Sequence, residues 1–473
     1  MPKVLTSIPG YYGTGSTEIT PAAGPGESGV RRLTNSKDVL IKQPADGIET
    51  VNDLVSYAAR THGNRNALGW RDVVDIIEEE KEVTKVVDGK EVVEKKKWKY
   101  FELSDYKYMT YLDVKTAVSE ISRGLIDLGV AKGDVFNVYA QTRYATSLIL
   151  SILLTDSCSP NWQLISYGCG SASITIATAY DTLGEEGLTH SLNEPDCVGV
   201  FTNAELLPTL LRVLSKTPTV NIVVYDGEPK KSVLDDIRAI RDTIKLMTVD
   251  ELRATGRALS TDSLDARVPK KEDVALIMYT SGSTGNPKGV VLTHSNLVAS
   301  VGGIRTLLGH HLVPDDTYLA YLPLAHVLEF IVELIFFYTG LPIGYGRVKT
   351  LTDASVRNCK GDISTFRPSI MVGVPAVWET IRKGILAKVH AGGTIKKNVF
   401  NGAYTVKKKN FPVLSQLADA VVFSGVKAAT GGRLRIAMSG GAALSRETQE
   451  FLSTALVTVL QGQSSASRKP GLS

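Results

Sequence analysis

A run of small hydroxyl and glycine residues, closed by a lysine, lies between two short apolar segments of this chain. It reads YTSGSTGNPKG over residues 279–289. Serine, threonine and glycine carry little bulk, so backbone N–H groups in such a loop can approach phosphate oxygens closely, and glycine permits the positive φ that the loop geometry requires. Lys288 adds a compact, mobile positive charge. The run therefore predicts a phosphate-binding loop.

The segments on either side of this loop predict how it is mounted. Residues 274–279 are almost entirely apolar, which is typical of a buried strand, and residues 289–293 predict a second short strand. A helix is expected next, with Ser295 available as its cap. Its apolar residues recur at helical spacing and are Leu297, Val298, Val301, Ile304, Leu307 and Leu308.

Of two other interpretations of the loop, the first is excluded by residue order and the second is weaker. The P-loop of nucleoside triphosphatases needs Gly-Lys followed by Ser or Thr at a helix N-terminus, whereas here Lys288 precedes Gly289 and a valine follows. A flexible surface turn is the common meaning of a glycine- and serine-rich composition. Such a turn seldom lies between two buried strands and ends on one lysine, so phosphate binding is the preferred interpretation.

The loop resembles the signature of the adenylate-forming, AMP-binding enzymes, which activate carboxylic acids as acyl-adenylates. Further stretches narrow the resemblance to long-chain fatty acid–CoA ligases, particularly those of fungi. The resemblance implies an α/β fold, the large N-terminal domain of that family, in which mostly parallel sheets are layered with helices. The stretches that carry it are residues 181–184, 322–329, 344–346, 374–379 and 439–445.

The rest of the chain is consistent with that fold class, because short apolar runs alternate with helical patterns. These runs are residues 135–140, 198–201, 222–225, 370–373 and 434–438.

Four segments define the expected organisation around an AMP-binding domain at 51–462. Residues 1–50 contain Pro/Gly/Ser clusters and are expected to form a surface extension. Residues 75–105 are heavily charged and contain the Asp-Gly signal of a β-hairpin. Residues 143–160 interrupt the family pattern as an atypical insert, and residues 463–473 form an aberrant tail.

Composition excludes several function classes. The chain has 473 residues, of which 43% are apolar, and its 53 basic residues nearly balance 49 acidic ones without a basic block, which argues against a nucleic-acid partner. Its four cysteines lack metal-ligand spacing, so a reducing compartment is expected. The start resembles no secretory signal, and a secreted protein is not expected.

Membrane attachment, if present, should be peripheral. No uncharged apolar stretch reaches the ~18 residues that a spanning helix needs, and the best, residues 330–338, contains Glu333. The resemblance implies a protein on the cytosolic side, at the endoplasmic reticulum, lipid droplets or peroxisomes.

The resemblance also implies the reaction and its site. ATP and the carboxylate of a fatty acid form an acyl-adenylate, and coenzyme A then displaces AMP. Thr280 and Lys288 are the implied catalytic residues, with Thr280 a ligand of Mg²⁺ and Lys288 neutralising charge as pyrophosphate leaves. The residues implied to clamp the phosphates are Thr280, Ser281, Gly282, Ser283, Thr284, Gly285 and Lys288.

The nucleotide base and the acyl group are assigned to other segments by the same resemblance. His326 is either a packed, hydrogen-bonded residue or a border of the acyl site, and a role as general base is disfavoured because the substrate carboxylate is already ionised. Trp378 either lines the fatty-acid tunnel or packs in the core. The implied adenine and AMP contacts are Gly440, Gly441, Ala442, Gln461 and Gly462.

The chain departs from the family after Gly462, where the family continues with Tyr-Gly-Leu-Thr-Glu. We therefore expect the small C-terminal domain, with its catalytic lysine, to be absent and acyl-CoA formation by this chain to be negligible. Two alternatives stay open. One is another acid–CoA ligase or an adenylation domain, and the other is a non-catalytic nucleotide- or lipid-binding remnant.

Overall fold

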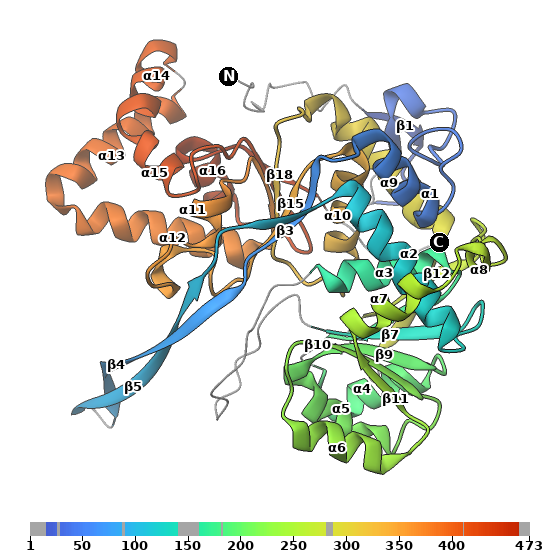
Figure 1. Ribbon diagram of the computed structural model, residues 1–473. Coiled ribbons are helices and arrows are strands. Elements are labelled where there is room, and N and C mark those ends of the chain that lie inside the picture. The colour runs from blue at the N-terminus through green and yellow to red at the C-terminus, as the bar shows by residue number, and fades with distance from the viewer. Residues whose placement is uncertain are drawn as a thin grey trace.

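Two sheets organise the part of the chain that the structure describes. Within these residues, a computed structural model shows two seven-stranded sheets and two separate two-stranded ribbons (Figure 1). The described residues are 16–25, 29–87, 90–140, 160–180, 183–280, 287–409 and 411–462.

The first sheet carries the strands that flank the expected phosphate loop. Its order is β11-β10-β9-β7-β8-β12-β13, and every neighbouring pair is parallel except β12 and β13, which are antiparallel. The strands are β7 (Val135–Tyr139), β8 (Thr175–Thr178), β9 (Gly199–Asn203), β10 (Ile222–Asp226), β11 (Lys245–Thr248), β12 (Val274–Thr280) and β13 (Lys288–Thr293).

The second sheet has the order β18-β17-β16-β14-β15-β3-β6, and only its β3–β6 pair is antiparallel. Mostly parallel sheets layered with helices confirm the predicted α/β class. The strands are β3 (Asn66–Trp70), β6 (Lys107–Thr110), β14 (Tyr318–Ala320), β15 (Ile343–Tyr345), β16 (Ile370–Gly373), β17 (Ile436–Ser439) and β18 (Val459–Gln461).

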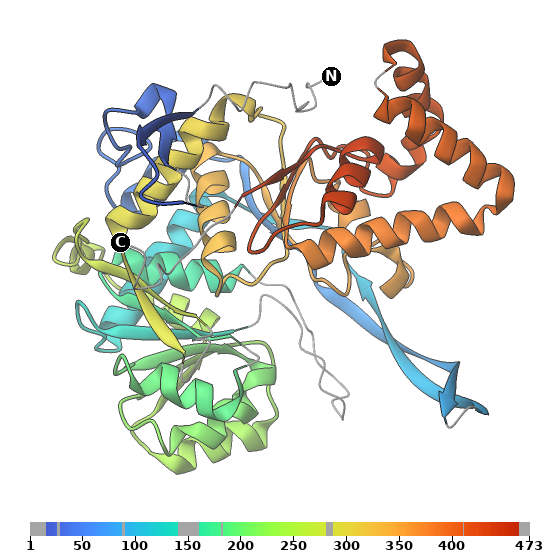
Figure 2. The ribbon, with the colours of Figure 1, turned by 180° about the vertical axis from the view of Figure 1, so that it is seen from behind.

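A layer of helices joins the two sheets. One hydrophobic cluster contains side chains from both sheets and from these helices, and Figure 2 shows the same layer from behind. Both sheets thus bury one face against a common set of side chains. The helices are α1 (Val51–His62), α2 (Tyr111–Asp127), α3 (Asn161–Ser171), α9 (His294–Leu308) and α10 (Val327–Thr339).

The opposite face of the first sheet packs in a second hydrophobic cluster. Neighbouring residues of β10 divide between the clusters, since Val223 belongs to the second and Val224 to the first, as the alternation of a strand requires. The helices that contribute to this cluster are α4 (Gly184–Asn193), α5 (Leu207–Leu214) and α6 (Lys231–Ile240).

The remaining helices, apart from α8, also contribute side chains to the first hydrophobic cluster. The two helices α7 and α8 follow the first sheet's edge strand β11, and the others belong to the second sheet's half of the chain (Figure 1). They are α7 (Val249–Ala258), α8 (Asp262–Asp265), α11 (Asp362–Phe366), α12 (Pro375–Ala391), α13 (Gly393–Lys408), α14 (Pro412–Val421), α15 (Phe423–Ala428) and α16 (Arg446–Ala455).

Both two-stranded ribbons lie where the sequence suggested elements outside the core. Strands β1 (Ser16–Thr20) and β2 (Val30–Leu33) pair within the N-terminal extension. Strands β4 (Val73–Val87) and β5 (Lys90–Leu103) form the long hairpin that projects from the body (Figure 1). Arg357 anchors this hairpin, since its guanidinium pairs with Glu79 at 2.5 Å and lies over the Tyr100 ring, 3.4 Å from its centroid.

Helix α9 begins at a different cap from the one expected. Thr293, not Ser295, is the N-cap, since its Oγ1 accepts the Asn296 N–H at 3.3 Å while the Asn296 side chain accepts the Thr293 N–H at 3.0 Å. Thr293 has the extended backbone that a cap needs because it is the last residue of β13, and this places Ser295 inside the helix. Leu307, expected on the apolar face, is exposed.

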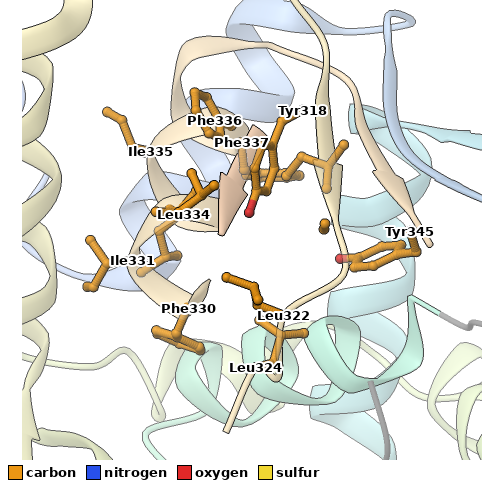
Figure 3. Packing of buried hydrophobic residues seen from close by; sticks show 14 of the residues in the cluster. Tyr318, Leu322, Leu324, Phe330, Ile331, Leu334, Ile335, Phe336, Phe337 and Tyr345 are labelled. Atoms are coloured by element: carbon orange, nitrogen blue, oxygen red, sulfur yellow. The ribbon is translucent and has the colours of Figure 1, made fainter. Parts of the chain in front are cut away.

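Helix α10 carries two fully buried carboxyl groups. The hydroxyl of Tyr318 donates to Glu329 Oε2 at 2.7 Å, and that of Tyr345 donates to Glu333 Oε2 at 2.8 Å. Figure 3 shows both tyrosines among the aromatic and aliphatic side chains of this core. Burial raises the pKa of Glu333 to about 8, and burial together with the neighbouring Glu333 raises the pKa of Glu329 well above its ordinary value.

None of the helices within the described ranges combines the length and the apolar character that crossing a bilayer would demand.

Replacing Glu333 by Gln should make stability less dependent on pH. Between the ordinary pKa of 4.5 and the folded value of about 8, the unfolded chain releases this proton while the folded chain retains it. Glu333 therefore lowers the free energy of unfolding by about 1.4 kcal/mol per pH unit as pH rises through that window. Thermal unfolding between about pH 5.5 and about pH 7.5 should show a flatter profile for Glu333→Gln.

The exposed Glu228 offers a matched control, because Glu228→Gln changes the same atoms at the surface. Equal pH profiles for Glu333→Gln and the unsubstituted protein would show that Glu333 is ionised in the folded state.

Candidate functional site

The expected phosphate loop connects two paired strands. Thr280 ends β12, Lys288 begins β13, and these two residues are direct partners in the antiparallel register. Lys288 is exposed. The loop residues Ser281, Gly282, Ser283, Thr284 and Gly285 lie outside the described residues, so their phosphate-binding role stays a prediction.

The position of this loop in the sheet matches where ligands bind in α/β proteins. Strand β12 is parallel to β8, with Met278 opposite Thr178, and β8 is parallel to β7, with Thr178 opposite Val138. The carboxyl ends of the three strands therefore share one edge. Open α/β sheets bind their ligands beyond this edge, so Thr280 and Lys288 lie at the expected place.

A residue of helix α4 contacts the segment that leads into Lys288, and the sequence analysis did not predict this contact. His190 Nε2 lies 2.9 Å from the carbonyl oxygen of Pro287, directly before Lys288, and its ring meets Tyr279 edge-on with centroids 5.9 Å apart. Burial raises the pKa of Tyr279, with Glu194 contributing. No spacing rule connects a helical histidine to a loop almost a hundred residues away in the chain, so only the fold reveals this contact.

The predicted adenine-contacting residues meet at the edge of the second sheet. The Gly440 N–H donates to the Gly373 carbonyl at 3.0 Å at the end of β16, and the Gly462 N–H donates to the Ser439 carbonyl at 2.9 Å. Gln461 is the register partner of Ser439 in β18. Gly440, Gly441, Ala442, Gln461 and Gly462 thus gather at the carboxyl ends of three neighbouring parallel strands.

Glycine is required in this turn because other atoms approach it closely. A β-carbon on Gly440 would lie 2.9 Å from Leu328 Cδ2 and 3.4 Å from the Gly462 carbonyl oxygen. Gly441 has φ +81°, a conformation that side chains disfavour. Beside the turn, the buried Ser439 Oγ has no hydrogen-bond partner among the described residues. Bare backbone next to an unsatisfied hydroxyl suits a flat polar ring such as a nucleobase.

His326 caps α10 next to this turn. Its Nδ1 accepts the Leu328 N–H at 3.1 Å, and Leu328 is the residue that packs against Gly440. The His326 side chain is exposed, while the desolvation by nearby protein lowers its pKa, so the ring is neutral near pH 7. The structure thus gives His326 a capping role and brings the positive end of the α10 dipole to the glycine turn. A border role at the acyl site stays a prediction.

Trp378 supports the same edge from inside the core. It is fully buried, and its Nε1 donates to the Met438 carbonyl at 3.2 Å. A β-carbon on Gly373 would come within 2.9 Å of that nitrogen. Of the two roles that the sequence left open for Trp378, packing is the one the described contacts show.

The described residues contain no cluster of three or more His, Cys, Asp or Glu side chains able to hold a metal ion. The role of Thr280 toward Mg²⁺ stays a prediction.

The fold and these two strand edges define an adenylate-forming α/β domain, with a hydroxyl- and glycine-rich loop on one sheet and a glycine turn on the other. The family model described as AMP-binding enzyme matches residues 89–464, and the chain belongs to this family.

The relatives are named as ligases of fatty acids. The chain is 40% identical to long-chain-fatty-acid–CoA ligase 2 of Schizosaccharomyces pombe over 96% of its own length and 63% of that protein. It is 39% identical to ligase 4 of Saccharomyces cerevisiae, over 94% of the chain and 64% of that protein. The chain therefore spans somewhat less than two thirds of these relatives.

A solved structure supports the fold. The adenylation domain of a carboxylic acid reductase from Segniliparus rugosus, in complex with AMP and a co-purified carboxylic acid, has a TM-score of 0.63 and 18% identity, covering 90% of this chain and 63% of that one.

Two glycine substitutions should separate backbone strain from ligand contact. Gly441 and Gly432 have φ of +81° and +77°, and neither has a crowded β-carbon position. Gly441→Ala and Gly432→Ala should therefore each cost about 1–2 kcal/mol of stability. Only Gly441→Ala should weaken AMP binding, by about tenfold, because its methyl group would displace the base. Thermal unfolding and calorimetry with AMP measure the two effects, and equal AMP affinity in both variants would remove Gly441 from the site.

Proposed function

We propose that this chain binds ATP and joins its α-phosphate to the carboxylate of a long-chain fatty acid, as in a fatty acid–CoA ligase whose second step transfers the acyl group to coenzyme A. The observation that carries this proposal is the pairing of Thr280 with Lys288 at the carboxyl edge of a parallel sheet. That arrangement places an exposed amine at the end of a phosphate-type loop, within the region that the AMP-binding family model covers.

Each edge would bind a different part of the nucleotide. Lys288 would neutralise charge on the β- and γ-phosphates, since a lysine ammonium is a mobile point charge. The turn at Gly440 and Gly441 would take the adenine, because backbone without side chains lets a flat ring lie close. Thr280 would hold Mg²⁺, which supplies further neutralisation of phosphate charge when bound.

The proposed fatty acid substrate rests on the relatives, because no described residue indicates which acyl chain length the site accepts. The yeast proteins with about 40% identity are named for long-chain fatty acids. A screen of short, medium, long-chain and aromatic acids, with acyl-AMP as the product measured, distinguishes this substrate class from other acid–CoA ligases and adenylation domains.

Removing the loop lysine tests the proposed function directly. Lys288→Met should weaken MgATP binding by about ten- to hundredfold, because charge-assisted contacts to phosphate contribute about 1.5–3 kcal/mol. It should also abolish exchange of pyrophosphate into ATP that depends on palmitate. Calorimetry and the exchange assay on the same preparations measure both effects.

Lys216→Met is the matched control, because Lys216 is an exposed lysine on another loop. Equal MgATP affinity in the Lys288 and Lys216 variants would contradict the proposal. MgATP binding without any exchange would indicate a non-catalytic nucleotide-binding protein instead.

We further propose that the protein associates peripherally with membranes or lipid droplets on the cytosolic side. The support is α14, whose exposed apolar side chains lie within an arc of about 100° around the helix. Residues 393–421 around it contain five lysines and one aspartate, which suits an anionic lipid surface. Figure 1 shows α14 projecting from the body. The exposed apolar residues of α14 are Val413, Leu414, Leu417 and Val421, and the exposed Phe411 directly precedes the helix.

Flotation with vesicles of phosphatidylcholine and phosphatidylserine tests this association. The triple variant Leu414→Ser, Leu417→Ser and Val421→Ser should bind at least about tenfold more weakly, because three apolar side chains no longer enter the lipid. The control is Val39→Ser with Leu40→Ser, two residues exposed at 71% and 61% elsewhere on the chain. Equal flotation of both variants would remove α14 from any lipid contact.

A further inference from the structure

His190 contacts strand β12 and the residue that directly precedes strand β13. It lies on α4, half-buried, with Nε2 2.9 Å from the Pro287 carbonyl oxygen on the β13 side. On the β12 side its ring meets Tyr279 at an interplanar angle of 72°. A carbonyl oxygen only accepts, so Nε2 carries a proton and donates it.

This hydrogen bond acts on the peptide that leads into Lys288. The Pro287 carbonyl belongs to the planar peptide unit that ends at the Lys288 nitrogen, so fixing that oxygen fixes the plane from which Lys288 starts. The proline ring further restricts the backbone on the other side of the carbonyl. Cross-strand pairing with Thr280 orients Lys288 from the opposite direction.

The imidazole is itself held in place. Tyr279, whose ring it meets, is buried in the sheet and is the register partner of Gly289. Glu194, one helical turn after His190, has its Oε2 3.7 Å from the same Nε2. The His190 ring thus has contacts on two sides, and these contacts fix the direction in which its Nε2–H donates.

We propose that His190 is a positioning residue for Lys288: through the Pro287 carbonyl it sets the direction in which the lysine amine meets the nucleotide phosphates. This inference rests on the proposed role of Lys288 in binding MgATP. The residue acts through the backbone, so its substitution should change phosphate affinity without removing any group that contacts the nucleotide.

Three substitutions separate the donor from the ring. His190→Gln keeps an N–H donor and loses the ring, His190→Phe keeps a ring and loses the donor, and His190→Ala loses both. His390→Ala is the control, because His390 is an exposed histidine on α12. Calorimetry gives the MgATP affinity, and hydrogen exchange of the free protein gives the protection of peptides that cover Lys288.

We expect His190→Phe and His190→Ala to weaken MgATP binding about three- to tenfold and to speed exchange around Lys288 by a similar factor, as the loss of one hydrogen bond implies. His190→Gln should stay within about twofold of the unsubstituted protein, as should His390→Ala. The proposal would be overturned if His190→Phe bound MgATP as tightly as the unsubstituted protein. It would also be overturned if His190→Gln bound MgATP as weakly as His190→Ala.

The two measurements distinguish a failure of the proposed function from a failure of the positioning role. If the unsubstituted protein binds no MgATP, the proposed function fails, while exchange around Lys288 still decides whether His190 orders this segment. If Lys288→Met weakens binding and none of the His190 variants does, the proposed function stands and the positioning role is wrong.

Discussion

The helix layer between the two sheets is the constraint on which the rest of the structure depends. Each sheet buries one face against the same helices, in one continuous cluster of apolar side chains. The carboxyl edges of both sheets are therefore fixed relative to one core. Helix α10 connects this core to the glycine turn. Its side chains pack at the centre of the layer, and Leu328 in its first turn packs against Gly440.

The same helix layer buries two carboxyl groups, whose ionisation there is unfavourable. Glu329 and Glu333 lie where no solvent reaches, and each receives one tyrosine hydroxyl as a donor. Two neighbouring carboxylates in such surroundings would be strongly destabilised if ionised, which is why both pKa values rise. These groups strengthen the core only as neutral acids, so stability and pH are linked at the helix that connects the glycine turn to the interior.

Patterns confined to neighbouring residues were sufficient to predict much of the fold. The apolar run at 274–279 predicted the strand β12, and the alternation of apolar runs with helical patterns predicted layered sheets. These predictions are confirmed because buried parallel strands have continuous apolar runs in the sequence. The cap of α9 was wrong by two residues, since Thr293 ends a strand and caps a helix at once. Local composition alone does not show which hydroxyl has the extended backbone.

What the sequence could not predict depends on contacts between distant segments. The hydrogen bonds from His190 to the Pro287 carbonyl and from Trp378 to the Met438 carbonyl arise only after the sheets form. The residues of the glycine turn were predicted by resemblance, whereas the reason for glycine there, the close approach of Leu328, required the packed structure.

Hydrogen exchange of the whole chain with and without MgATP tests most directly whether the two sheet edges form one nucleotide site. We expect slower exchange both in the β12–β13 hairpin and in the segment from Ser439 to Ala442. Protection at one edge alone, or at neither, would contradict a single site built on the shared helix layer.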